Sequence, residues 1–271
     1  GIEDSTLIYK AMGVAEAALT KHLLPAAIER QTTYLCSKFL KCPEPNRFPE
    51  QIYAHFKENY ELSKRNVINN EMNAQIQFIY DQIDGMMEGL EDIVTIEELW
   101  TYMGRNEIVN VARFLSSDKR GDKKLDLVKE GVIGDRSGTV LMKISDQKDD
   151  VFFAHNTITG YGESLSKISK VYIIDQTKRI LFSSPPCQIS PIDFCLITGN
   201  GIIVNGVQIN CKDEAFIDMT YSTIGFPAWI RLLSASTQAS DTSTFISQFG
   251  YYPTVTATQT VYVCDAKKFG V

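Results

Sequence analysis

The chain has 271 residues, of which 44% are hydrophobic, so it can bury a substantial core in one large domain or two small ones. Its 27 lysines and arginines against 33 aspartates and glutamates give a net charge of −6, and basic residues form no long cluster. This charge pattern argues against a nucleic-acid-binding surface. No apolar run approaches the roughly 18 residues of a membrane-spanning helix, and the first residues lack the basic start of a signal peptide. We therefore expect a chain that does not span a membrane, which is compatible with the mature part of a secreted protein.

The first part of the chain, from Ile2 to about Ser116, has helical patterns. Apolar residues recur at spacings of three and four, and Pro25 and Pro49 stand where helices should begin. Thr95 and Glu98 form a capping-box pattern that predicts a further helix start. The predicted helical segments are 11–19, 49–67, 74–90 and the stretch that opens at 95, with a turn at 42–46.

From Thr139 onward the chain changes to short runs of β-branched and aromatic residues, which predict strands. Two late helical patterns, 227–236 and 241–249, interrupt them, and Gly199 to Gly201 reads as a tight turn between strands. Helices first and sheet afterwards indicate an α+β fold with mainly antiparallel strands. The predicted strands are 139–144, 151–155, 170–175, 179–184, 193–197, 201–209 and 259–264. The lysine-rich link from Ser116 to Asp126 is expected to be an exposed loop, with a processing site as the alternative.

The chain has six cysteines and three histidines, but no cysteine pair has the two-residue spacing of a zinc knuckle. The sequence therefore does not predict a structural metal site. Cys36 and Cys42 bracket a short loop, and their spacing alone fits a disulfide and two free thiols equally well. His22 and His55 fall within helical patterns, which indicates surface or packing positions. The phosphate-loop, dinucleotide and serine-hydrolase-elbow motifs are missing, so we predict neither a metal nor a cofactor.

One polar cluster stands out, because His155, Asn156 and Thr157 follow a predicted strand. A strand end that opens onto a loop is where a rigid scaffold presents reactive groups. The alternative is a half-buried histidine that bonds to the backbone. Neither interpretation is excluded by these three residues alone.

A series of landmarks along the chain resembles the phospholipase B-like family. They are a Gly-Val-x-Glu-Ala-Ala helix at Gly13 to Ala18, a short Cys-to-Cys loop at Cys36 and Cys42, and a Gln-x-x-Gly segment at 82–85. A His-Asn-Thr cluster at 155–157 and a Trp-x-Arg helix at 229–231 follow in the same order. The resemblance implies an N-terminal nucleophile hydrolase fold, an αββα sandwich, as a single domain over 1–271. Its mainly helical pro-part would be 1–137 and its mainly β nucleophile chain 138–271.

The resemblance also implies a mechanism of self-cleavage. In this family a cysteine becomes a new N-terminus, its α-amino group serves as the base, and backbone or Asn donors hold the oxyanion. That cysteine stands 17 positions before the His-Asn-Thr cluster, which in this chain is Gly138. Glycine has no side chain to attack a carbonyl, so we expect an uncleaved chain. His155 and Asn156 would line the catalytic pocket, with Thr157 and Arg231 as substrate contacts.

Three explanations for Gly138 stay open: an engineered Cys-to-Gly change, a natural relative that has lost catalysis, or a site shifted to Ser137 or Thr139. Two departures favour lost catalysis. Ile158 replaces the aromatic residue that the family places after the cluster, and the late segment 249–259 lacks the Asn of the family's oxyanion donor. The two functional hypotheses are a hydrolase of an amide or acyl ester that lacks its nucleophile, and a non-catalytic relative used for binding.

The resemblance further implies a lysosomal or secreted protein with a lipid or amide substrate. The chain contains no Asn-x-Ser/Thr glycosylation acceptor, which is unusual for a lysosomal relative. No pattern in the chain indicates an oligomeric state.

Overall fold

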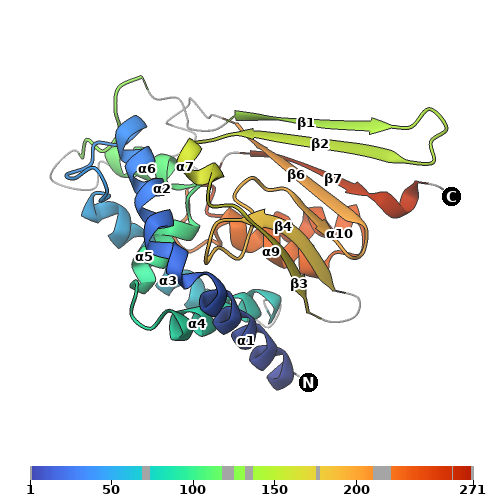
Figure 1. Cartoon of the computed structure of the whole chain (residues 1–271), viewed down its shortest axis with the longest axis horizontal. Coiled ribbons are helices and arrows are strands. Elements are labelled where there is room, and N and C mark those ends of the chain that lie inside the picture. Colours follow the sequence, from blue (N-terminus) through green and yellow to red (C-terminus); the bar gives the residue numbers. More distant parts are fainter. Residues whose placement is uncertain are drawn as a thin grey trace.

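A computed structural model describes residues 2–68, 74–117, 125–131, 137–174, 178–209, 221–257 and 259–269. It confirms an α+β fold in which a helical part precedes the strands (Figure 1). The first six helices are α1 (Ile2–Thr20), α2 (Leu24–Lys38), α3 (Glu50–Ile68), α4 (Ala74–Leu90), α5 (Ile96–Met103) and α6 (Ile108–Ser117). The later helices are α7 (Tyr161–Ser164), α9 (Ala228–Gln238) and α10 (Thr242–Phe249), and two 3-10 turns are η1 (Lys21–Leu23) and η3 (Ala266–Lys268). None of the described helices is long and apolar enough to cross a membrane.

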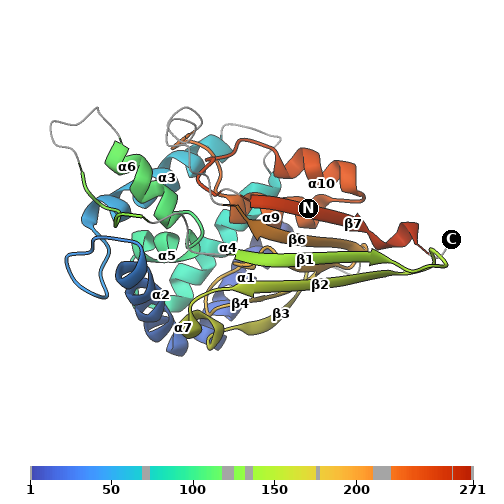
Figure 2. The same ribbon diagram turned by 90° about the horizontal axis from the view of Figure 1, so that it is seen from above.

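Within the described residues the strands form two antiparallel sheets. A two-stranded hairpin contains β1 (Ser137–Ile144) and β2 (Val151–Ile158). A five-stranded sheet has the order β3 (Ile168–Ile173), β4 (Arg179–Ser184), β5 (Leu196–Thr198), β6 (Ile202–Gln208) and β7 (Gln259–Asp265). The hairpin lies over β6, while α9 and α10 lie on the opposite side of the five-stranded sheet (Figures 1 and 2).

Local sequence signals account for several element boundaries. Pro25 lies in the first turn of α2, and α3 begins directly after Pro49. The Thr95 side chain accepts from the Glu98 N–H while the Glu98 carboxylate accepts from the Thr95 N–H, so the predicted capping box is confirmed. Gly201 has a φ of 76° in the turn between β5 and β6, a conformation that glycine adopts without a steric penalty.

Several predicted strand boundaries differ from the observed ones, and two of the differences have a clear cause. The run at 193–197 forms a strand only over Leu196–Thr198, because the Asp193 carboxylate accepts the Cys195 N–H and holds the preceding residues in a turn. The run at 170–175 begins earlier, at Ile168, where the ladder with Ser184 of β4 starts.

Glycines allow α1 and α4 to cross with their backbones in close contact. A Cβ added to Gly13 would lie 1.8 Å from the Gln82 carbonyl oxygen, and one added to Gly85 would lie 2.0 Å from the Lys10 carbonyl oxygen. Real Cβ atoms do not approach backbone this closely, so only glycine fits at either position. The two landmark segments at 13–18 and 82–85 are therefore the two sides of one helix crossing.

The same landmark helix carries a buried ion pair. Glu16 Oε1 lies 2.7 Å from the Lys170 Nζ of β3, and both side chains are at most 7% exposed. Thr20 Oγ1 and the Cys187 N–H also donate to Glu16 Oε1, at 3.1 and 3.0 Å. Lys170 donates to the carbonyls of Pro185 and Gln188 as well. This network joins α1 to β3 and to the loop that follows β4.

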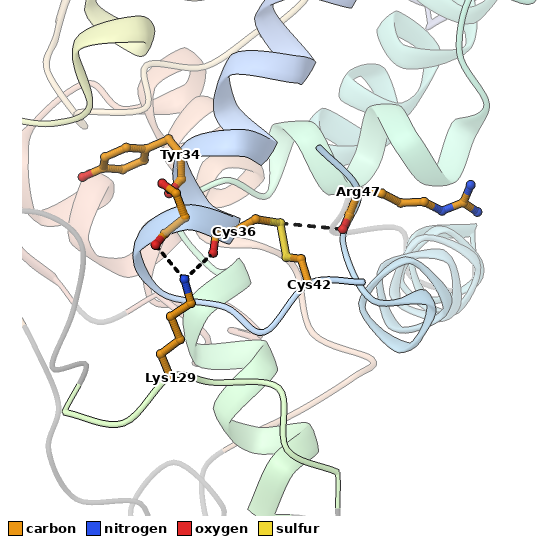
Figure 3. Close-up of a disulfide and its surroundings, with 6 residues drawn as sticks. Tyr34, Cys36, Cys42, Arg47 and Lys129 are labelled. Carbon is orange, nitrogen blue, oxygen red and sulfur yellow. Dashed lines mark hydrogen bonds between the residues drawn. A yellow bond between two sulfur atoms is a disulfide. The ribbon is translucent and has the colours of Figure 1, made fainter. Parts of the chain in front are cut away.

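Cys36 and Cys42 form a disulfide at the end of α2, with a Cα–Cα distance of 5.5 Å (Figure 3). The Lys129 ammonium donates to the carbonyls of Cys36 and Ser37 at 2.8 and 2.6 Å, as Figure 3 shows. The backbone of residues 127–129 also bonds to residues 39–41. Residues 118–124 of the predicted lysine-rich loop lie outside the described residues, as does Cys211.

His55 is packed inside the helical part and is only 7% exposed. The Tyr221 hydroxyl bonds to the imidazole, and the Phe56 ring lies edge-on to it. Burial disfavours the imidazolium and lowers the pKa of His55 to about 4. The folded protein therefore holds this ring neutral over most of the acidic range.

Acid should destabilise the protein through His55. Its folded pKa lies below the unfolded value of about 6.5, so its contribution is complete above pH 6.5 and is lost as the pH falls toward 4. We expect the free energy of unfolding to drop by about 3 kcal/mol across this window, measured by urea denaturation. His55→Gln should flatten this part of the pH profile, whereas the matched change at exposed His22, His22→Gln, should not. An equal acid loss in both variants would contradict the assignment.

Candidate functional site

The β1–β2 hairpin brings Gly138 and His155 onto one face. In the strand register Gly138 pairs with Thr157, and Val140 pairs with His155. Paired residues of an antiparallel sheet project to the same face, and β2 alternates between half-buried and exposed residues. His155 and Thr157 are half-buried, whereas Asn156 is exposed. The hairpin therefore gathers positions 138, 155 and 157, and it directs the Asn156 side chain to the other face.

The strand that carries the polar cluster is longer than predicted. β2 continues to Ile158, which pairs with Ser137, so all three residues of the cluster lie within the strand. The reason is that β1 starts at Ser137 and supplies ladder partners for the whole cluster. The residues are therefore held by the sheet and not by a loop.

His155 bonds to the neighbouring sheet through its Nε2 atom. That atom lies 3.1 Å from the Gly206 carbonyl oxygen of β6 and 3.2 Å from the Thr157 hydroxyl. A carbonyl oxygen only accepts, so the bond to Gly206 places the ring hydrogen on Nε2. The lone pair of a neutral His155 is then on Nδ1. His155 thus anchors the hairpin onto β6. It is a half-buried histidine that bonds to the backbone, which was one of the two interpretations of this residue from the sequence.

A small pocket opens beside Gly138. Gly138, Thr157, Gly206, Asn106 and Asp193 contribute to its lining. Asp193 is 8% exposed, and its carboxylate lies 2.5 Å from the Lys167 ammonium. The lining of the pocket therefore combines two glycines with a carboxylate that is already neutralised by an ion pair.

The backbone of the neighbouring strand lies so close to Gly138 that it leaves no room for a side chain. A Cβ added at this position would lie 2.5 Å from the Asn156 carbonyl oxygen. Backbone atoms cannot rotate aside as a flexible side chain can, so any larger residue at 138 requires a shift of the hairpin. Position 138 is therefore accessible to the pocket but sterically restricted in this conformation.

Arg231 is 7% exposed and is not among the residues that line the pocket beside Gly138. Its guanidinium donates to the carbonyls of Phe226 and Phe249, and it lies 4.8 Å from the centre of the Phe249 ring. Burial lowers the pKa of Arg231 to about 10, while nearby Glu107 favours the charged form. These contacts join the start of α9 to the end of α10. A substrate contact by Arg231 stays a prediction.

No sequence motif points to Glu107, a buried carboxylate in the turn before α6. It accepts from the Ala228 N–H at 2.9 Å and from the hydroxyls of Thr254 and Thr256. Burial raises the pKa of Glu107, and these donors act in the opposite direction. The late segment 249–259 thus supplies hydroxyls to this carboxylate. No local signal could have identified these contacts, because the partners are more than 120 residues apart in the chain.

No group of three or more His, Cys, Asp or Glu side chains in the described part of the chain is arranged to hold a metal ion. Cys187 and Cys264 are buried as free thiols, and Cys195 is half-buried. Burial raises the pKa of Cys187 and of Cys195 to about 11. Both thiols are therefore held protonated at neutral pH, which makes them poor nucleophiles.

Comparison with known proteins identifies the relatives of this chain. It is 24% identical over 268 residues to "Putative phospholipase B-like 1" of Caenorhabditis elegans, covering 96% of this chain and 45% of the relative. It is 23% identical over 286 residues to "Putative phospholipase B-like 2" of Homo sapiens, covering 98% of this chain and 47% of that relative. The chain thus spans about half the length of these relatives. The Phospholipase B family profile matches residues 2–271, and the chain therefore belongs to the phospholipase B family.

Proposed function

We propose that this chain is a phospholipase B-like hydrolase of amide or acyl-ester bonds that is present without its nucleophile and therefore stays uncleaved. Family membership supports a hydrolase-type function. The observation that carries the rest is Gly138, which shares the inner face of the hairpin with His155 and Thr157 beside a pocket. In self-cleavage a thiol at 138 would attack the carbonyl carbon of residue 137 and form a thioester as the peptide C–N bond breaks. Water would then hydrolyse the thioester, which leaves a carboxylate on residue 137, a free thiol at 138 and an α-amino group at 138 that can act as the base. Glycine supplies no attacking atom.

This proposal places the chain in the N-terminal nucleophile hydrolase fold as a single domain, with 1–137 as the pro-part and 138–271 as the nucleophile chain. The stacking of the hairpin on the five-stranded sheet, with α9 and α10 beyond it, supports an αββα-type arrangement. Thr157 lines the pocket beside Gly138, which supports its proposed role as a substrate contact. The proposed roles of Asn156 in the catalytic pocket and of Arg231 in substrate contact require a rearrangement, because Asn156 is exposed on the other face of the hairpin and Arg231 is bonded to backbone carbonyls. A lysosomal or secreted location is supported by the disulfide, because such bonds persist in oxidising compartments.

A second candidate function is non-catalytic binding by a relative with the same fold. The close approach of the Asn156 carbonyl to Gly138 favours it. A backbone shaped around glycine is expected of a chain that has adapted to that residue. A simple exchange of cysteine for glycine would instead leave room for a Cβ.

The variant Gly138→Cys separates the two candidates. The unaltered protein should show one intact mass after expression, whereas Gly138→Cys should split between residues 137 and 138 and gain hydrolysis of amide or acyl-ester substrates. Gly138→Ala is the matched control, because it adds the same Cβ without a thiol and should stay intact. A folded Gly138→Cys protein that stays whole and inactive would favour the binding function. Spontaneous cleavage of the unaltered chain at this bond would contradict both.

A further inference from the structure

One face of the five-stranded sheet is partly open. A row of apolar residues crosses the sheet on this face, because Val171, Leu181, Ile197, Ile203 and Cys264 are successive ladder partners. The first three are 57%, 45% and 44% exposed, whereas Cys264 at the other end of the row is 6% exposed. The row is therefore covered at its β7 end and open over β3, β4 and β5. We call Val171, Leu181 and Ile197 the open row.

The neighbouring row shows the same kind of side chain under a covering layer. Phe182, Leu196 and Val204 are also successive ladder partners, and they are at most 4% exposed. Successive residues of a strand point to opposite faces of a sheet, so this second row lies on the side of α9 and α10. The open row has no such layer over it. A continuous exposed strip of aliphatic side chains marks an interaction surface.

The β1–β2 hairpin has an open apolar face as well. Leu141, Phe152 and Ile158 are each more than half exposed, and the strand register places them on the face opposite to that of His155. The inner face of the hairpin lies over β6 (Figures 1 and 2). Among the described strands the hairpin has no further ladder partner. We call Leu141, Phe152 and Ile158 the outer hairpin face.

The open row and the outer hairpin face together have the size of a dimer interface. A standard interface buries about 800 Å² per partner, of which slightly more than half is apolar. The exposed parts of the large apolar side chains on these surfaces amount to about 400 to 500 Å² in each copy, from about 60 to 120 Å² for a whole aliphatic side chain and about 200 Å² for an aromatic one. The side chains counted are Val171, Ile173, Leu181, Ile197 and Tyr262 on the sheet, and Leu141, Phe152 and Ile158 on the hairpin.

The two surfaces also fit each other in character. Among their ladder positions the charged residues are Arg179 and Lys143, each at or next to a strand end. Neither surface therefore indicates a charged partner. In a two-fold symmetric pair the contact between surface A and surface B is made twice, so the outer hairpin face of each copy can cover the open row of the other. Packed sheets lie about 10 Å apart, and the hairpin already occupies that layer over β6.

We propose that the open row and the outer hairpin face bind a second copy of this chain in a two-fold symmetric dimer. The hairpin of one copy packs on β3, β4 and β5 of the other, so each hairpin lies between two five-stranded sheets. One occupant then covers both apolar surfaces. The proposal does not depend on the proposed hydrolase function, because Gly138 and His155 lie on the inner face of the hairpin.

Sedimentation velocity of the intact chain over a range of concentrations tests the dimer. We expect a concentration-dependent species of twice the mass of one chain. Phe152→Glu and Leu181→Lys should each weaken the dimer by about a hundredfold, because each dimer would bury two unpaired charges. The matched control is Leu19→Glu, at an exposed leucine of α1 outside both surfaces, which should leave the dimer intact. Val171→Lys, on the edge strand β3, is the second variant of the open row.

A mixture of two variants tests which surfaces meet. Equal amounts of the Phe152→Glu and Leu181→Lys chains should recover a dimer, because one of its two contacts is unaltered and the other joins opposite charges. A mixture of folded chains, as judged by circular dichroism, that stays monomeric would overturn the contact between hairpin and row. So would a dimer that survives Phe152→Glu but not Leu181→Lys, which would mean that row packs on row.

Two further outcomes would overturn the dimer on these surfaces. One is an unaltered chain that sediments as a monomer up to about 100 µM, because preformed interfaces of this size have micromolar or lower dissociation constants. Another polypeptide would then have to cover the open row. The other is a dimer that survives both Leu181→Lys and Val171→Lys, which would place the interface elsewhere on the chain.

Discussion

The substitution Gly85→Ala should lower the free energy of unfolding by about 2 to 3 kcal/mol, measured by urea denaturation. The added Cβ would lie 2.0 Å from the Lys10 carbonyl oxygen and 2.8 Å from the Lys10 carbonyl carbon, so α1 and α4 would have to move apart. Both contacts are with backbone, which cannot swing aside. Alanine favours an isolated helix over glycine by about 1 kcal/mol, and the loss stated here is net of that gain.

Gly162→Ala is the matched control for this glycine. Its Cβ would lie 3.3 Å from the Arg30 Cβ and farther from any other atom, so the neighbour has to move by only a few tenths of an ångström. We expect a change within about 0.5 kcal/mol. Equal stability of the two alanine variants would show that the α1–α4 crossing is not limited by these backbone contacts.

Replacing Lys170 by methionine should cost about 3 to 5 kcal/mol, because it leaves the buried Glu16 carboxylate without its cation. The remaining donors to Glu16 Oε1, Thr20 and the Cys187 N–H, are neutral. Methionine keeps most of the side-chain volume, so lost packing contributes little. Thermal and urea denaturation of the variant measure the loss.

A double-mutant cycle separates the loss of the Glu16–Lys170 ion pair from the other effects of substituting these two residues. Glu16→Gln combined with Lys170→Met removes both charges and should recover most of the lost stability. Lys41→Met, at the exposed pair between Lys41 and Asp126, should leave stability unchanged within the precision of the measurement. Strictly additive effects of the two buried substitutions would contradict a direct coupling between Glu16 and Lys170.

Sequence alone predicted the helical part well because its signals are local. The segment 74–90 has the bounds of α4, and the Thr95 capping box appears as expected. Strand bounds were less accurate, because a strand ends where its ladder partners end. β2 extends through the His-Asn-Thr cluster because β1 provides partners as far as Ser137.

The candidate site could be predicted only in part. The spacing from Gly138 to His155 anticipated two positions that the hairpin places on one face. The exposure of Asn156 and the backbone partners of Arg231 depend on strand phase and on helix packing, which the spacing of residues does not encode. Asn106, Gly138 and Asp193 come from three separate segments, so only the folded chain brings them to one pocket.

The contacts of residues 127–129 with the end of α2 have a consequence for proteolysis. The Lys41 and Lys129 N–H groups bond to the Leu127 and Phe39 carbonyls, and the Lys129 ammonium bonds beside the disulfide. A protease cut between residues 117 and 125 would therefore leave both new ends attached to the body, one through α6 and the other through this short backbone pairing. The two fragments would be expected to travel as one particle under native conditions and to separate only when denatured, as complementing halves of a single fold.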